Sequence, residues 1–165
     1  MTGTELLQRL EEYAKQRRLK LGQGLGAGVH GIVFAAQSQS SVGRVALKAH
    51  RNEADYRRER DAYLRLRERQ VVAIRGCNVP ERLGYDDSLF VIEMTVVVRP
   101  FVLDFGGAFL DDAPEFPDEV LADWRSEKME QFGPRWPEVQ SILAGLESYG
   151  IYLLDVNPGN ISFAE

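Results

Sequence analysis

A glycine-rich run between two apolar stretches limits what this chain can fold into more than any other feature. Five glycines fall between residues 22 and 31, and the end of the run reads Gly26-Ala-Gly28-Val-His-Gly31-Ile-Val33. Its spacing is G-x-G-x-x-G-x-V. Glycine allows backbone torsions that other residues resist, and it brings amide donors close to phosphate oxygens. The run therefore predicts a phosphate-binding loop, and the residues after it determine its kind.

Three kinds of loop share these glycines, and the next residues distinguish them. A dinucleotide-binding loop opens a helix, whereas residues 32–34 are Ile-Val-Phe, which are typical of a strand. A Walker loop needs a Gly-Lys-Ser/Thr sequence, which this chain lacks. In the third kind a strand, a hairpin turn and a second strand with a lysine come after the glycines. Residues 38–43 form a polar turn and residues 44–50 read as that strand, so a dinucleotide-binding fragment is the weaker interpretation.

The second strand contains Val45-Ala-Leu-Lys48, one conservative change from the V-A-I-K pattern. With the glycine motif before it, this part of the chain resembles the protein-kinase superfamily. The resemblance implies an ATP site in which the hairpin covers the nucleotide and Lys48 orients its phosphates. The nucleotide-binding residues that it implies on the hairpin are Gly26, Gly28, Gly31, Val33, Ala46 and Lys48. The alternative is a lysine that merely extends from an apolar strand to solvent.

The resemblance also implies a glutamate that pairs with the lysine, and a hinge that binds adenine. Residues 52–69 are rich in helix formers and contain Glu59, our choice for the partner, with Glu53 as the alternative. A solvent-exposed glutamate is the simpler interpretation. The hinge is expected at Glu93-Met-Thr95, with Ile92 at the back of the pocket. An ordinary buried strand end would give the same apolar pattern.

Near the end of the sequence, residues 150–161 read Gly-Ile-Tyr-Leu-Leu-Asp-Val-Asn-Pro-Gly-Asn-Ile. The stretch resembles the kinase catalytic loop, whose Asp and Asn are also five residues apart. The resemblance implies that Asp155 receives the proton of an attacking hydroxyl and that Asn160 binds magnesium. Simple turn chemistry is the alternative, because Asn-Pro-Gly is a strong turn signal. Leu153 and Leu154 replace the usual His-Arg pair.

The metal-binding Asp-Phe-Gly of the family comes after this loop, but here the tripeptide stands upstream, at residues 104–106. Residues 96–105 read like the strand that delivers it. We expect a rewired order, in which this strand pairs with the last strand, residues 161–163, and brings Asp104 to the magnesium ion. A chance tripeptide, with Asp104 capping a turn, is the equal alternative.

These expectations define an α+β fold with a protein-kinase-like N-lobe, made of an antiparallel sheet and a helix. A reduced, mainly helical C-lobe would carry the catalytic loop as a hairpin. The predicted boundaries are 1–98 for the N-lobe, with an N-terminal helix over 4–17, and 99–165 for the C-lobe. Further helices are expected near 118–132 and 137–149, and an antiparallel pair from residues 82–85 and 89–98.

The predicted function is a minimal phosphotransferase that uses ATP and magnesium and acts on a hydroxyl acceptor, preferably a small molecule. The alternative is a pseudokinase-like binding module. A net charge of −5 argues against nucleic acid as a partner. Neither a membrane-spanning apolar run nor a signal peptide is evident, which indicates a cytoplasmic protein. A homodimer or partner protein could cover the short C-lobe through Phe132, Trp124 and Trp136, although core packing is the commoner fate of such residues.

Overall fold

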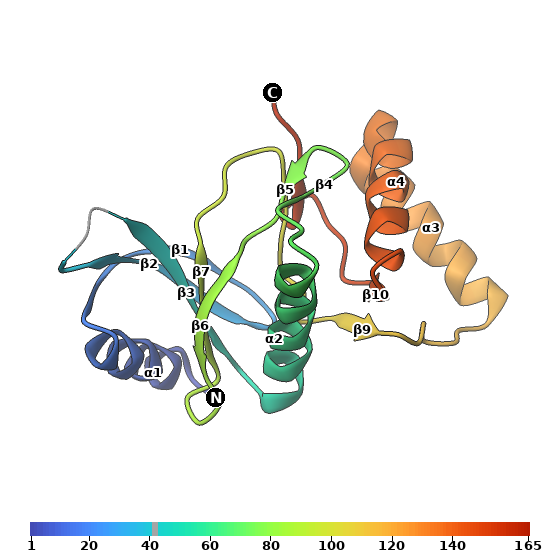
Figure 1. Ribbon diagram of the computed structural model, residues 1–165. Helices are drawn as coiled ribbons and strands as arrows, with labels where there is room; N and C mark the ends of the chain where they lie inside the picture. The colour runs from blue at the N-terminus through green and yellow to red at the C-terminus, as the bar shows by residue number, and fades with distance from the viewer. Residues whose placement is uncertain (41–42) are drawn as a thin grey trace.

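The computed structural model describes residues 1–40 and 43–165 of a mixed α+β fold. Its central element is a five-stranded antiparallel sheet with the order β1-β2-β3-β7-β6 (Figure 1). Its strands are β1 (Leu19–Ala27), β2 (Gly31–Ser38), β3 (Arg44–His50), β6 (Arg82–Asp86) and β7 (Val91–Thr95). The α+β class is confirmed. The predicted turn over residues 38–43 falls partly on Ser41 and Val42, which lie outside the described residues.

Two helices cover the two faces of this sheet (Figure 1). Helix α1 (Gly3–Gln16) begins in a capping box formed by Thr2 and Glu5, and helix α2 (Glu53–Glu68) begins at an Asn52 cap. Because side chains alternate along a strand, Leu47 and Ala49 of β3 pack with α1, whereas Ala46 belongs to the core on the α2 side. The helices predicted over 4–17 and 52–69 are confirmed.

The rest of the chain forms two small sheets and two long helices. One sheet has the order β11-β8-β5-β4, and the other pairs β9 with β10. Helices α3 (Asp118–Phe132) and α4 (Trp136–Glu147) are joined by a 3₁₀ turn, η1 (Gly133–Arg135), as the sequence predicts. The short strands are β4 (Ala73–Ile74), β5 (Cys77–Asn78), β8 (Phe101–Val102), β9 (Ala108–Leu110), β10 (Ile151–Leu153) and β11 (Ile161–Ser162).

The last two strands correct one prediction and confirm another. The catalytic loop is not a hairpin, because β10 pairs with β9 and β11 pairs with β8. The pairing of β11 with β8, in the register Ile161↔Val102 and Ser162↔Phe101, is the one that the rewired order predicts. Strand β8 is shorter than the expected 96–105. Strands β4 and β5 precede the predicted boundary at 98/99 yet share a sheet with β8 and β11, so both halves contribute to that sheet.

The aromatic residues expected at an interface lie in or against the core. Phe132 and Trp136 are buried in the main core, and Trp124 packs against it. They are therefore core residues, and the prediction that Phe132 and Trp136 form an exposed interface is wrong.

Across residues 1–40 and 43–165, the structure contains no helix with the length and apolarity that crossing a membrane requires.

The core beneath β8 gives a test of stability. Phe105 is fully buried, and its ring meets Tyr63 of α2 edge-on, with the ring centroids 5.1 Å apart. Because its removal leaves a cavity, we expect Phe105→Ala to lower the free energy of unfolding by about 3–5 kcal/mol in urea titrations. Phe116→Ala, at a residue 42% exposed, should change it by less than about 0.5 kcal/mol. Equal losses in the two variants would contradict this packing.

Candidate active site

Lys48 of β3 lies at the centre of a buried ionic cluster. Its Nζ atom is 2.7 Å from Oε2 of Glu59 in α2 and 2.8 Å from Oδ1 of Asp104, which comes after β8. Strand β3, helix α2 and the segment after β8 thus meet at one ammonium group, and only 4% of Lys48 is exposed. The alternative partner Glu53 is exposed and pairs with Arg57 on its own helix. Of the two candidates, the structure therefore brings Glu59 to the lysine.

The cluster keeps its charges because each one is compensated. Burial acts to lower the pKa of Lys48, but Glu59 and Asp104 raise it above its usual value. Burial likewise acts to raise the pKa of Glu59, but the charge of Lys48 and a hydrogen bond with His50 hold it well below its usual range. An uncompensated buried charge is strongly destabilising. Lys48 is therefore fixed in place and does not extend to solvent.

His50 is a member of this cluster that the sequence analysis missed. Its Nε2 atom lies 2.6 Å from Oε2 of Glu59, and its Nδ1 atom lies 3.1 Å from the carbonyl oxygen of Phe90. The imidazole is fully buried. His50 stands two residues after Lys48 on β3, so strand alternation places both side chains on one face. That spacing was the signal available in the sequence.

The glycine loop forms the turn between β1 and β2. Gly26 lies near the end of β1, and the Gly28 N–H donates to the Gly31 carbonyl at 2.9 Å, which closes the turn. A Cβ atom on Gly31 would lie 2.0 Å from the Ala49 carbonyl oxygen, so the hairpin requires glycine there. Gly26 and Gly28 have open space around them. They leave room at the tip of the loop.

The apolar residues predicted on this hairpin lie next to the lysine. Val33 is the register partner of Lys48 across β2 and β3, and Ala46 is two residues before it on β3. Ala46 is buried, and Val33 packs against the same core. A flat apolar ligand could reach both residues only from the side of the sheet that carries Lys48.

His30, at the tip of the glycine loop, is a second residue that the sequence analysis missed. Its Nδ1 atom lies 3.0 Å from Oδ2 of Asp55, and its Nε2 atom lies 2.8 Å from Oδ2 of Asp155. Burial acts to lower the pKa of His30, but the hydrogen bonds with these two carboxylates raise it above its usual value. The only signal in the sequence is its place inside the glycine motif.

The loop that carries Asp155 and Asn160 folds tightly on itself. The Asn160 side chain donates from Nδ2 to the Asp155 carbonyl at 3.1 Å, and the backbone N–H groups of Asn160 and Ile161 donate to the Asn157 carbonyl. The Leu103 N–H donates to the Asn160 carbonyl at 2.9 Å. This bond places Asp104, the next residue, beside the loop. Asp104, Asp155 and Asn160 thus gather where β8 ends.

Asp104 and Asn160 carry side-chain oxygens of the kind that magnesium prefers. Within the described chain, no three His, Cys, Asp or Glu side chains are grouped as metal ligands. Magnesium usually needs only one or two protein oxygens, because phosphates and waters supply the rest. Asp104 uses Oδ1 to bind Lys48, which leaves Oδ2, and Asn160 retains its amide Oδ1. Asp104 and Asn160 thus offer two oxygens, which fits a magnesium ion whose other ligands are phosphates and waters.

The predicted hinge does not fit the structure. Glu93 and Thr95 lie inside β7, which has β3 on one edge and β6 on the other. The Glu93 carboxylate accepts hydrogen bonds from Tyr13 and Arg17, while the Thr95 N–H donates to the Glu81 carbonyl. A hinge needs free backbone groups, so its placement at residues 93–95 is wrong. Ile92 is fully buried on β7 opposite Lys48.

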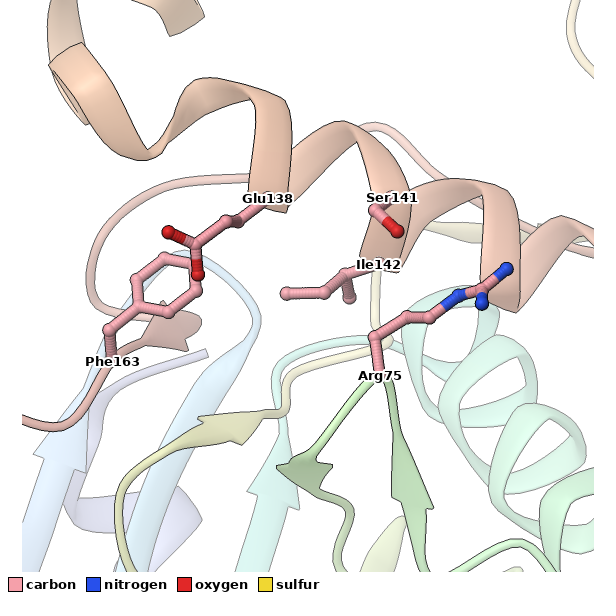
Figure 2. A pocket seen from close by; sticks show the side chains of 5 residues that line it. All are labelled: Arg75, Glu138, Ser141, Ile142 and Phe163. Carbon is pink, nitrogen blue, oxygen red and sulfur yellow. The ribbon is translucent and has the colours of Figure 1, made fainter.

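A small hollow lies away from this cluster, where α4 passes over the turn between β4 and β5 (Figure 2). This hollow is lined by Arg75, Glu138, Ser141, Ile142 and Phe163, and none of them belongs to the Lys48 cluster or to residues 150–161.

The chain matches no protein-family model, and a search of curated proteins finds no match. The candidate site therefore rests on its geometry and chemistry.

The His30 contacts predict a pH dependence. Since the folded pKa is raised above the ordinary value of about 6.5, the two hydrogen bonds stabilise the fold fully below about pH 6.5, and this stabilisation is lost as pH rises through the folded pKa. The free energy of unfolding should be larger for wild type than for His30→Ala. We expect this difference to be greatest at about pH 6 and to become smaller towards about pH 9. Wild type and the variant both contain His50, so the difference between their unfolding free energies reports on His30. A difference that grows with pH would contradict the assignment.

Proposed function

We propose that the chain is a kinase-like phosphotransferase that uses ATP and magnesium and transfers phosphate to a hydroxyl acceptor. One observation carries the proposal: Lys48 binds both Glu59 and Asp104, within reach of the loop that carries Asp155 and Asn160. A glycine hairpin, a strand lysine, a helix glutamate and two loop oxygens are the groups that phosphoryl transfer in this superfamily uses. The sheet order, with α2 against it, also supports a kinase-like N-lobe.

The proposal includes a changed chain order. In the family, the Asp-Phe-Gly segment comes after the catalytic loop, whereas here Asp104 precedes it by 51 residues in the sequence (104 to 155). Two strand pairings compensate, because β8 pairs with β11 and β9 pairs with β10, on either side of the Asp104–Gly106 segment. Asp104 can therefore occupy the position of the family's metal aspartate, although its sequence position differs.

Each residue has a defined role in this proposal. The turn at Gly28 and Gly31 covers the phosphates with backbone N–H groups, and Lys48 orients them. Asp155 receives the proton of the acceptor hydroxyl. Magnesium, held by Asp104 and Asn160, neutralises phosphate charge when it is bound. We assign adenine binding to residues 96–98, which leave the sheet after β7, in place of residues 93–95.

The alternative is a pseudokinase-like module that binds a nucleotide without turning it over. Two observations favour it: Leu153 and Leu154 replace the family's His-Arg pair, and Lys48 is covered. The retained Lys48, Asp155 and Asn160 favour the enzyme. The acceptor is best sought among small hydroxyl compounds, because only α3 and α4 stand as long helices between β9 and the catalytic loop.

Magnesium binding tests the role of Asp104. We expect Asp104→Ala to weaken ATP binding in magnesium by about tenfold or more, about 1.4 kcal/mol, and to change binding in EDTA much less. Calorimetry with a non-hydrolysable ATP analogue measures both. Asp112→Ala, which removes an exposed aspartate after β9, is the matched control and should bind as wild type does. Unchanged affinity in Asp104→Ala would leave the rewired metal site without support.

Turnover separates the enzyme from the binding module. With ATP labelled in its γ-phosphate, we expect transfer to a hydroxyl compound or to water, and Asp155→Ala should lower its rate by about 10²–10⁴-fold. Nucleotide affinity should change little, because Asp155 acts on the acceptor. Tight magnesium-dependent binding without turnover, across a panel of sugars, amino alcohols and nucleosides, would favour the pseudokinase alternative.

A further inference from the structure

His30 links three parts of the site that no strand pairing within residues 1–40 and 43–165 connects. Its backbone lies in the glycine turn, its Nδ1 atom contacts Asp55 in the first turn of α2, and its Nε2 atom contacts Asp155 of the catalytic loop. The His30 and Asp55 side chains are 13% and 15% exposed. The two contacts, at 3.0 and 2.8 Å, have hydrogen-bond lengths. His30 thus bridges the hairpin to both partners.

The contacts of His30 with Asp55 and Asp155 determine which ring nitrogens of His30 carry hydrogens. Carboxylate oxygens only accept hydrogen bonds, so an imidazole between two carboxylates must donate from both nitrogens. His30 is then an imidazolium, and it donates from Nε2 to Oδ2 of Asp155. The other oxygen of Asp155, Oδ1, has no hydrogen bond to residues 1–40 or 43–165. It is the oxygen left for a hydroxyl proton.

The surroundings of His30 fit the imidazole closely. A Cβ atom on Gly106 would lie 2.8 Å from Cγ of His30, and one on Gly107 would lie 3.0 Å from Cβ of Asp155. The two glycines after Phe105 therefore leave space for the bridge. The His30 carbonyl also accepts a hydrogen bond from the Arg51 N–H at 3.0 Å, which fixes the backbone that carries the ring.

We propose that His30 is a positioning residue for Asp155: held by Asp55, it fixes one carboxylate oxygen and leaves the other for the acceptor hydroxyl. The assignment rests on the proposed phosphotransferase function. Asp55 acts only through His30, because its carboxylate contacts His30 and its own helix cap, Asn52. The bridge also holds the glycine turn against the catalytic loop, so it has a consequence in the protein without nucleotide.

Hydrogen exchange of the nucleotide-free protein tests the bridge itself. We expect His30→Ala and Asp155→Ala each to speed amide exchange in residues 26–31 by about tenfold, and the double variant to add little, because both changes break the same contact. Asp61→Ala, which removes a carboxylate bound to Arg60 on the same helix, should leave this exchange unchanged. Wild-type exchange in all variants would overturn the proposal.

Kinetics test the positioning role. We expect His30→Ala to lower kcat by about tenfold or more while the KM for ATP changes less than about threefold, since Asp155 acts on the transfer step. His30→Gln, whose amide can still donate to Asp155, should recover part of kcat. Asp55→Ala should lower kcat in the wild-type chain but not in His30→Ala, because Asp55 acts through the imidazole.

Two kinetic outcomes would overturn the assignment in distinguishable ways. A raised KM for ATP with unchanged kcat in His30→Ala would make His30 a nucleotide-binding residue. The variants could show the expected exchange pattern while the wild-type protein transfers no phosphate to any acceptor. That result would refute the proposed function, and the positioning role with it. In that case the bridge would remain a structural closure of the loop.

Discussion

The site depends on the ion pairs that the buried ammonium group of Lys48 forms with Glu59 and Asp104. Taking a charge out of water is unfavourable unless opposite charges and hydrogen bonds replace the solvent. Glu59 and Asp104 supply those charges from α2 and from the segment after β8. Because the two carboxylates come from different halves of the chain, the position of one lysine fixes how α2 and β8 lie relative to the sheet.

Two short strand pairings hold the Asp104 segment beside this cluster. Only two residues of β8 pair with β11, and three of β9 pair with β10, yet they hold the Asp104 segment from both sides. Phe105 anchors it further by packing against Tyr63 of α2. Helices α3 and α4 then need only to span the distance between β9 and β10. In the proposed phosphotransferase, these pairings would compensate for the changed order of the Asp104 segment and the loop that carries Asp155.

Local patterns in the sequence were enough to predict most helices and strands, whereas the Lys48–Glu59 pair was expected only from the resemblance to protein kinases. Strand alternation, helix formers and glycine spacing are short-range signals, and they predicted α1, α2 and the hairpin. The pairing of β8 with β11 was expected from the rewired order that the resemblance suggests. The hinge failed for a physical reason. Residues 89–98 read as one continuous strand in the sequence, and only the pairing with β3, which ends near Thr95, shows where the strand leaves the sheet. His30 and Asp55 are 25 residues apart, so no local pattern connects them.

The two histidines show how α2 could couple the halves of the site. Asp55 and Glu59 are four residues apart, about 6 Å along one face of the helix. Each holds a histidine of the hairpin region, Asp55 at His30 and Glu59 at His50, and Gly31 and His50 are direct register partners. A displacement of α2 would thus disturb the contact of Lys48 with Glu59 and that of His30 with Asp155 together. In the proposed enzyme, the orientation of the phosphates by Lys48 and the acceptance of a proton by Asp155 would then depend on the position of a single helix.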